Sequence, residues 1–293
     1  PETTVDAGGA PDNVFLIESN ESPQTVIQNL VIRGGQAGNG SGMFLNNSSP
    51  TIMMCLFEDN VTTLGEGGAV VAHNSGSRFF GCAFRNNTAI TNGGAIYCSG
   101  PAIPSFEACF IFENEAQASG GGLYVDGGTL VMTDCNIDVN ICGEEGGGVK
   151  FSNGESSFIR CYFDGNLAGT GGGGMTVFGS TTTIVDSEFA VNVAPPGLAG
   201  GIYGHESMVF MSGCEVRSND GGGINSWAAT EFSLSNTLVC GNTSYQIQGV
   251  WNDDGGNEIS DECVLLDDLD QDGVWDFEDN CDIYNPDQAD CND

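Results

Sequence analysis

Basic residues are scarce in this 293-residue chain. Six Lys and Arg stand against 40 Asp and Glu, and the formal net charge is −34. Such a charge repels the phosphates of nucleic acids and anionic membrane surfaces, and it attracts divalent cations. We therefore expect no nucleic-acid partner.

Long apolar runs are missing too. No stretch approaches the roughly 20 apolar residues that a membrane-spanning helix needs, and the start at Pro1 has no basic and apolar leader. We expect no membrane insertion in this segment, which is either a processed product or part of something longer. Because 40% of the residues are hydrophobic, the acidity does not indicate disorder.

Glycine and cysteine are abundant, whereas proline is not. The 45 glycines have no G-X-Y period, which excludes collagen and favours an architecture of frequent tight turns. The 12 cysteines show no paired CxxC motifs of the zinc-binding type. We interpret this high, even number as a sign of an oxidising compartment, so that the protein is expected to be secreted, extracellular or on the cell surface.

An internal repeat organises most of the chain. A glycine pair followed by an apolar residue recurs with second glycines at Gly68, Gly94, Gly122, Gly148, Gly174, Gly201 and Gly223. A second column ends in an asparagine, at Asn60, Asn87, Asn114, Asn140, Asn166, Asn192, Asn219 and Asn242. A period of about 26 to 28 residues with short alternating strands predicts one coil of a parallel β-helix per repeat.

Stacked coils place equivalent residues above one another, about 4.8 Å apart. Two apolar columns should then form the core. The first contains Phe57, Phe84, Ile111, Ile137, Phe163, Phe189 and Val216, and the second contains Val70, Ile96, Leu123, Val149, Met175, Ile202 and Ile224. The asparagines are expected to adopt the left-handed conformation at a bend and to form a hydrogen-bonded ladder. The glycine pairs should supply unusual dihedrals or close approach.

Six cysteines occupy one repeat position: Cys55, Cys82, Cys109, Cys135, Cys161 and Cys214. We favour inert packing inside the coils over redox chemistry, although the spacing also permits disulfides between coils. Cys240 lies off this column and is expected to bond with Cys263 and staple the end of the helix.

The GGA[IV] and FxxN motifs, as in Gly93 to Ile96 and Phe84 to Asn87, resemble the repeats of chlamydial polymorphic outer-membrane proteins. They are also similar to those of other bacterial secreted right-handed β-helix proteins. The resemblance covers roughly residues 1–250. It implies an all-β, right-handed, single-stranded parallel β-helix of about nine coils, which we assign to residues 1–262. Adhesins, polysaccharide lyases and hydrolases all use this scaffold.

A calcium loop is predicted in residues 263–293. Carboxylates of Asp268, Asp270, Asp272, Asp276 and Asp279, with the carbonyl of Val274 and a glycine at position 273, match the ligand spacing of an EF-hand-like loop. Oxygen donors without His or Cys favour Ca²⁺ over zinc. The segment resembles a thrombospondin type-3 repeat, which implies bound calcium with a nearby disulfide.

A catalytic site is harder to find. Calcium-assisted cleavage of acidic polysaccharides needs clustered carboxylates and a Lys or Arg base, and Lys150 is the only lysine. Asp138 and Asp164 share a repeat position and are the best candidate acid pair or second metal site, while Glu58 and Arg85 should also stack. His73 and His205 are interpreted as turn or surface residues.

The sequence leads to two hypotheses for the function of this protein. The first is a calcium-stabilised extracellular structural or adhesive β-helix, which is not an enzyme and belongs to a surface or filamentous assembly. Its partners would be further copies, joined end to end into an oligomer or fibre, or a surface receptor or glycan. The alternative is a carbohydrate-active enzyme, a lyase or hydrolase.

Overall fold

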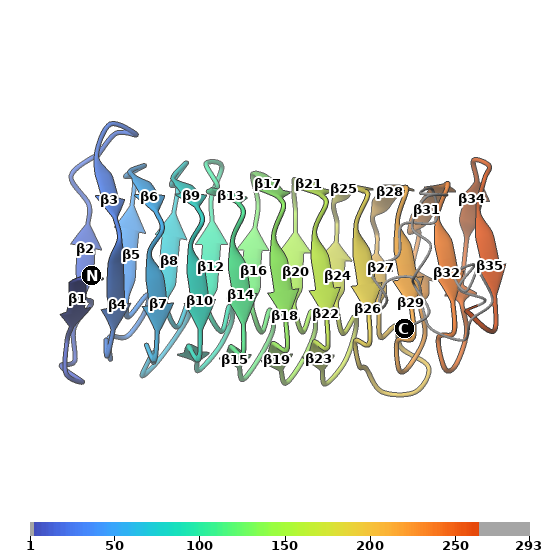
Figure 1. Cartoon of the computed structure of the whole chain (residues 1–293), viewed down its shortest axis with the longest axis horizontal. Coiled ribbons are helices and arrows are strands. Elements are labelled where there is room, and N and C mark those ends of the chain that lie inside the picture. Colours follow the sequence, from blue (N-terminus) through green and yellow to red (C-terminus); the bar gives the residue numbers. More distant parts are fainter. Residues whose placement is uncertain (1–2, 264–293) are drawn as a thin grey trace, which may run out of the picture. The chain divides into compact units, whose positions relative to one another are not determined.

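The computed structural model describes residues 3–263, which fold entirely into short strands joined by turns. The first of the chain's two compact units ends at Asp261 and is a stack of coils (Figure 1). All strand pairings within its sheets are parallel. The predicted all-β parallel β-solenoid of about nine coils is therefore confirmed.

Three long sheets and one short sheet run along the solenoid. Sheet A has eleven strands in the order β1 (Thr3–Asp6), β4 (Leu30–Arg33), β7 (Leu56–Glu58), β10 (Ala83–Arg85), β14 (Phe110–Phe112), β18 (Asn136–Asp138), β22 (Tyr162–Asp164), β26 (Glu188–Ala190), β29 (Glu215–Arg217), β32 (Leu238–Cys240) and β35 (Glu258–Ser260). Sheet B has ten strands in the order β2 (Phe15–Ile17), β5 (Met43–Asn46), β8 (Val70–His73), β12 (Ile96–Ser99), β16 (Leu123–Asp126), β20 (Val149–Ser152), β24 (Met175–Phe178), β27 (Ile202–His205), β30 (Ile224–Trp227) and β33 (Ile247–Gln248).

Sheet C follows sheet B along the chain in each coil. Its ten strands are β3 (Val26–Gln28), β6 (Thr51–Met53), β9 (Arg78–Phe80), β13 (Ser105–Glu107), β17 (Thr129–Thr133), β21 (Glu155–Ile159), β25 (Thr181–Val185), β28 (Met208–Ser212), β31 (Glu231–Ser235) and β34 (Trp251–Asp253). The four-stranded sheet D comprises β11 (Thr88–Ala89), β15 (Glu115–Ala116), β19 (Ile141–Cys142) and β23 (Leu167–Ala168).

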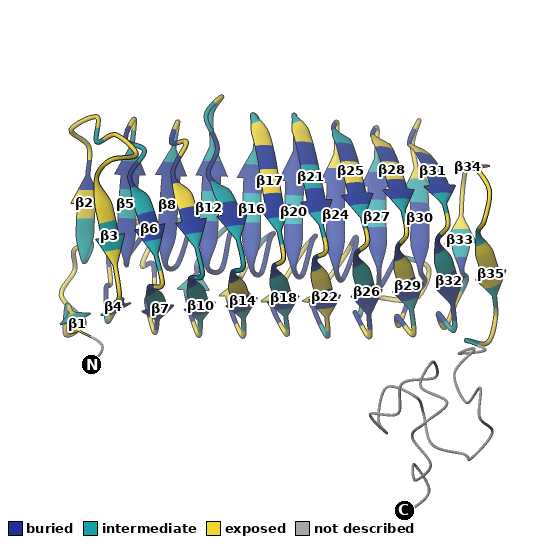
Figure 2. Cartoon of the chain, turned by 45° about the horizontal axis from the view of Figure 1, so that its top comes forward, coloured by how far each residue is buried: buried dark blue, intermediate teal, exposed yellow. Residues whose placement is uncertain are grey.

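The core lies inside the coils, as the repeat predicted. Phe84 pairs in register with Phe57 on one side and Ile111 on the other, and every member of the two predicted apolar columns is fully buried. The rings of Phe57 and Phe84 stack with centroids 4.9 Å apart, and those of Phe163 and Phe189 with centroids 4.3 Å apart. Alternate strand residues are buried and solvent-facing (Figure 2), which is the burial pattern of a strand with one face on a core.

The asparagine ladder is also confirmed, and each asparagine binds two coils. The Asn140 side-chain amide donates to the Ile111 carbonyl (2.8 Å) and to Asn166 Oδ1 (3.0 Å). Its own Oδ1 accepts from the backbone N–H (3.1 Å) and the side-chain amide (2.9 Å) of Asn114. The side chain thus satisfies the buried backbone N–H of Asn114 and links three successive coils.

The left-handed conformation, however, is not at these asparagines. The positive φ belongs to the residue just before each one, for example Asn86 (52°), Val139 (54°) and Gly165 (62°). The predicted position was therefore wrong by one residue. The bend is made by the preceding residue, whose side chain lies outside, because the asparagine itself must direct its amide inward to bond with both neighbouring coils.

The glycine pairs act in both of the expected ways. Gly93 has a φ of +67°, which residues with a Cβ rarely adopt. A Cβ on Gly94 would lie 2.1 Å from the Gly121 carbonyl oxygen of the next coil. At Gly93-Gly94 one glycine therefore serves the dihedral and the next serves close packing between coils. Before Gly121-Gly122 and Gly147-Gly148 the positive φ lies one residue earlier, at Gly120 and Gly146, and both members of the pair pack closely on the next coil.

Removal of one ladder asparagine should destabilise the whole solenoid. We expect Asn140→Ala to lower the free energy of unfolding by about 2–4 kcal/mol, because it leaves the buried backbone N–H of Asn114 without its acceptor and removes the side-chain hydrogen bonds to Asn114, Ile111 and Asn166. Asn136→Ala, on the outward side of β18, is the matched control and should change it by no more than about 0.5 kcal/mol. Urea denaturation of both variants makes the comparison, and equal effects would contradict a special role for the ladder.

Candidate functional site

The predicted calcium ligands Asp268, Asp270, Asp272, Val274, Asp276 and Asp279 lie outside the described residues. Within residues 3–263, no group of three or more His, Cys, Asp or Glu side chains is arranged to hold a metal ion. Candidate sites in this part of the chain must therefore be sought on the outer faces of the sheets.

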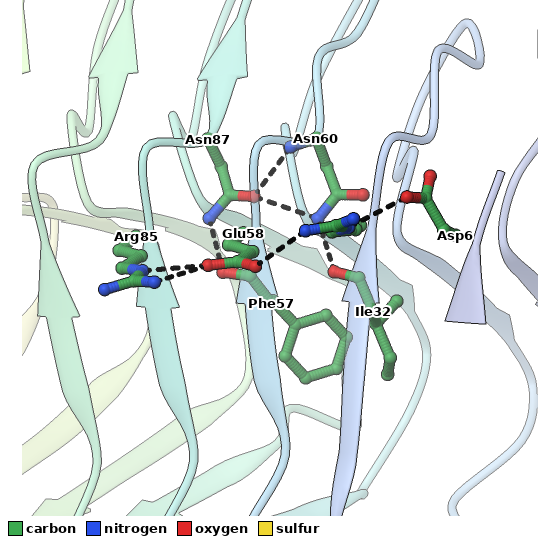
Figure 3. A network of polar contacts seen from close by, with 8 residues as sticks. Asp6, Ile32, Phe57, Glu58, Asn60, Arg85 and Asn87 are labelled. Carbon is green, nitrogen blue, oxygen red and sulfur yellow. Dashed lines mark hydrogen bonds and ion pairs between the residues drawn. The ribbon is translucent and has the colours of Figure 1, made fainter. Parts of the chain in front are cut away.

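A ladder of alternating charges crosses the first four strands of sheet A (Figure 3). Arg33 Nε lies 2.8 Å from Asp6 Oδ2, and Arg85 Nη2 lies 2.6 Å from Glu58 Oε2. Arg33 and Glu58 are joined more loosely, at 3.7 Å. The predicted stacking of Glu58 and Arg85 is confirmed. Because all four charges are paired, this row holds adjacent coils in register and offers no free catalytic group.

Asp138 and Asp164 are direct neighbours on β18 and β22, in the register that the repeat predicted. Phe112, on the preceding strand, continues the same row. Burial, and then repulsion from Asp164, raises the pKa of Asp138 to about 6. The two carboxylates can share a proton or a cation, but no Lys or Arg forms an ion pair with either one among the described residues.

The cysteine column is inert, as expected. All six of its members are free and buried in the coils, and Cys55, for example, donates to the Met53 carbonyl (3.3 Å). Burial raises the pKa of the Cys214 thiol to about 11, so it is a poor nucleophile at neutral pH. Cys240 and Cys263 are disulfide-bonded, in line with the expected staple.

The pocket that sequence reasoning missed lies on the outer face of sheet B. It has a volume of about 310 Å³ and is here named the Lys150 pocket. Strands β16, β20, β24 and β27 and the turns beside them supply its lining, which consists of Tyr124, Asp126, Glu145, Lys150, Ser152, Asn153, Phe178 and His205.

Lys150 is held firmly in this pocket. Its ammonium lies 2.6 Å from Glu145 Oε2, 3.4 Å from the Ser119 hydroxyl and 5.7 Å from the centre of the Tyr124 ring. Only 15% of the side chain is exposed. The lysine is therefore a preorganised hydrogen-bond donor with a paired charge.

Aromatic rings border the same pocket. Tyr97 and Tyr124 stack on neighbouring strands with centroids 5.4 Å apart, and Phe178 stacks on His205 at 4.9 Å. Trp227 continues the row beyond His205 and is 58% exposed. These rings form two parallel rows, because parallel pairing in register aligns the outward residues of successive strands.

Both histidines lie at the surface, as one of the two interpretations expected, but in strands instead of turns. His73 and His205 are the last residues of β8 and β27, so they are strand residues that are half-buried and not turn residues. The imidazole Nδ1 of His73 lies 2.8 Å from the Ser99 hydroxyl, and burial lowers its pKa. His205 Nδ1 is buried without a hydrogen-bond partner among the described residues.

The alternation of inward and outward residues in the strand after each glycine pair was the signal for this pocket. Tyr97, Tyr124, Lys150 and Tyr203 hold the second position of β12, β16, β20 and β27, and Phe178, His205 and Trp227 hold the fourth position of β24, β27 and β30. Glu145 could not be found in this way, since it lies in a turn.

Comparison with known families gives one match. Residues 81–99 match the repeat of the Chlamydia polymorphic membrane proteins. This short segment runs from the turn before β10 to the end of β12 and contains one FxxN and one GGA[IV] motif. No curated protein matches the chain significantly. Among the described residues, no helix has the length and apolar character to cross a bilayer.

The Asp138 pair makes stability depend on pH. In the folded protein the pKa of the Asp138 carboxyl is raised above its usual value of 3.8. The stability that this protonated group contributes is therefore fully present below about pH 4 and is lost as the pH rises to about 6. We expect Asp138→Asn to raise the free energy of unfolding near neutral pH by about 1–2 kcal/mol and to leave it unchanged below about pH 4. Thermal denaturation across this range measures the difference. Asp164→Asn should gain less, because it removes the repulsion but not the burial, and a pH-independent gain in Asp138→Asn would contradict the assignment.

Proposed function

We propose that this protein is an extracellular or cell-surface β-solenoid that acts as a structural adhesin, either alone or in an end-to-end assembly. The observation that carries the proposal is the difference between the interior of the coils and their outer faces. The interior repeats from coil to coil, whereas the outer faces present large apolar and aromatic side chains. Examples are Tyr162 on sheet A, Trp227 on sheet B and Phe210 on sheet C, which are 50%, 58% and 45% exposed.

Exposed side chains of this size on a rigid scaffold favour binding to other surfaces. Aromatic residues supply much contact area at a low cost in conformational entropy, and they are enriched in protein interfaces. The match of residues 81–99 to a membrane-protein repeat supports a location at the cell surface. The disulfide-bonded Cys240 and Cys263 support an oxidising compartment.

A second function is favoured by the composition of the Lys150 pocket. Lys150, Glu145, Asp126 and His205 line one cavity, and a base near carboxylates is what a polysaccharide lyase or hydrolase requires. The close pairing of Lys150 with Glu145 supports the adhesive function instead, because the only lysine of the chain is already engaged in an ion pair 2.6 Å long.

Calcium belongs to the proposal as a stabiliser of the C-terminal segment. Asp268, Asp270, Asp272, Asp276 and Asp279, with the Val274 carbonyl, form a set of hard oxygen donors that fits Ca²⁺. When bound, the ion would neutralise clustered carboxylates that otherwise repel one another. This chemistry is structural and supplies no reactive group.

Calcium binding should be visible through Trp275, which lies within the predicted loop. We expect Ca²⁺ to change the tryptophan fluorescence of the full chain, and the double change Asp270→Ala and Asp272→Ala to weaken the apparent affinity by at least about tenfold. Asp253→Ala with Asp254→Ala, two aspartates on and beside β34, is the charge-matched control and should titrate like the parent. An equal loss in both double variants would show a non-specific charge effect.

The adhesive function is tested in the organism that makes the protein. Deletion of the gene should reduce attachment of the cells to their natural surface, and the full-length protein should restore it. Antibodies raised against the folded solenoid should label intact, unpermeabilised cells. Undiminished attachment, or labelling only after the cells are opened, would overturn the proposal. Turnover of a polysaccharide by the purified protein would favour the enzyme instead.

A further inference from the structure

The Lys150 pocket combines groups from four successive coils. Tyr124 and Asp126 come from β16, Lys150 from β20, Phe178 from β24 and His205 from β27. The pocket therefore exists only when these coils are stacked in register. Its floor is rigid, because every contributing strand is paired on both sides.

The charges in the pocket argue against an anionic ligand. Asp126 and Glu145 are both acidic, and Lys150 alone opposes them with an ammonium that already lies 2.6 Å from Glu145. Over the whole chain, the net charge of −34 adds a repulsive field. A sulfated or uronic-acid polymer would have to approach two carboxylates with only one paired cation available.

The pocket is rich in hydrogen-bonding groups of both kinds. The Asp126 carboxylate accepts one hydrogen bond, from the Asn153 amide (2.7 Å), and so retains lone pairs for further donors. Lys150 and Asn153 can donate. His205 Nδ1 is buried without a partner among the described residues, and such a group recovers free energy when a ligand or water satisfies it. Neutral hydroxyls, which donate and accept at once, suit this set.

The apolar part of the pocket consists of two aromatic platforms: the partly exposed Phe178 ring, and the Tyr124 ring, whose faces lie toward Tyr97 and the Lys150 ammonium. Phe178 stacks on His205 with an angle of 12° between the rings and is 37% exposed, while Tyr124 stacks on Tyr97, also at 12°. Because β16 and β24 are separated by one strand, these platforms lie about 10 Å apart along the solenoid axis. The C–H face of a pyranose ring packs on an aromatic ring, and more than one sugar ring is needed to span this distance.

We propose that the Lys150 pocket binds a neutral oligosaccharide, with one sugar ring on Phe178 and another beside Tyr124, and with hydroxyls on Asp126, Lys150 and Asn153. This proposal rests on the adhesive function above and gives it a ligand class. Aromatic rings, carboxylate acceptors and a paired lysine occur together here. An uncharged sugar has C–H faces that pack on aromatic rings and hydroxyls that hydrogen-bond with the polar groups.

The test uses the full-length chain on an array of immobilised oligosaccharides with three groups of members: neutral hexoses, N-acetylhexosamines, and uronic-acid or sulfated sugars. We expect binding to uncharged members and none to acidic ones. Tyr124→Ala and Phe178→Ala should each weaken this binding by about tenfold or more. Phe110→Ala on sheet A and Met208→Ala on sheet C, at side chains that are 51% and 50% exposed, are matched controls, which should bind like the parent. Circular dichroism confirms that all four variants fold.

Three results would overturn the proposal: no binding to any uncharged sugar, a preference for acidic ones, or equal losses in the pocket and control variants. Its failure can be distinguished from failure of the adhesive function. If the gene deletion abolishes attachment but Tyr124→Ala restores it as fully as the parent protein, the solenoid is adhesive and the Lys150 pocket is not its binding site.

Discussion

In-register stacking of parallel coils is the constraint on which the rest of this structure depends. Every strand in the interior of a sheet bonds to the equivalent strand one coil before and one coil after it. At the corner after each sheet A strand from β7 to β32, the asparagine side chains add to these backbone bonds, because the backbone N–H of one ladder asparagine donates to the amide oxygen of the next. Each amide bonds to two neighbouring coils, as with Asn140 between Asn114 and Asn166. A residue that fits one coil must therefore also fit the coils beside it.

This constraint explains the chemistry of the interior. Aromatic and aliphatic residues stack on residues of similar shape, and thiols occupy a column where small polarizable side chains pack well. The cysteines are buried and donate to backbone carbonyls, as Cys214 does to Ser212 (3.4 Å). Their repetition reflects packing, and their buried thiols are unsuited to catalysis.

The outside of the coils is under weaker constraint, and function is expected there. An outward side chain needs only to be compatible with its neighbours in the same row. Sheet A uses this freedom for the charge ladder that begins at Asp6 and for the carboxylate pair of Asp138 and Asp164. Sheet B uses it for two rows that contain aromatic rings and for the Lys150 pocket. The same stacking that repeats the core also aligns these different residues along one face, so a binding surface can span several coils.

The sequence by itself determined the coil, the core columns and the asparagine ladder, because period and residue type suffice when equivalent residues must lie above one another. It also predicted which charges are neighbours, as with Glu58 and Arg85. The residue that takes the left-handed bend, one position before each asparagine, was not predictable from composition, since Val139 and Val191 occupy it against their usual preference. The Lys150 pocket was decided only by the tertiary structure. Glu145 reaches Lys150 from a turn, whose position the repeat period does not predict. The stacking of Phe178 on His205 depends on the orientation of both rings, which the repeat period does not predict either.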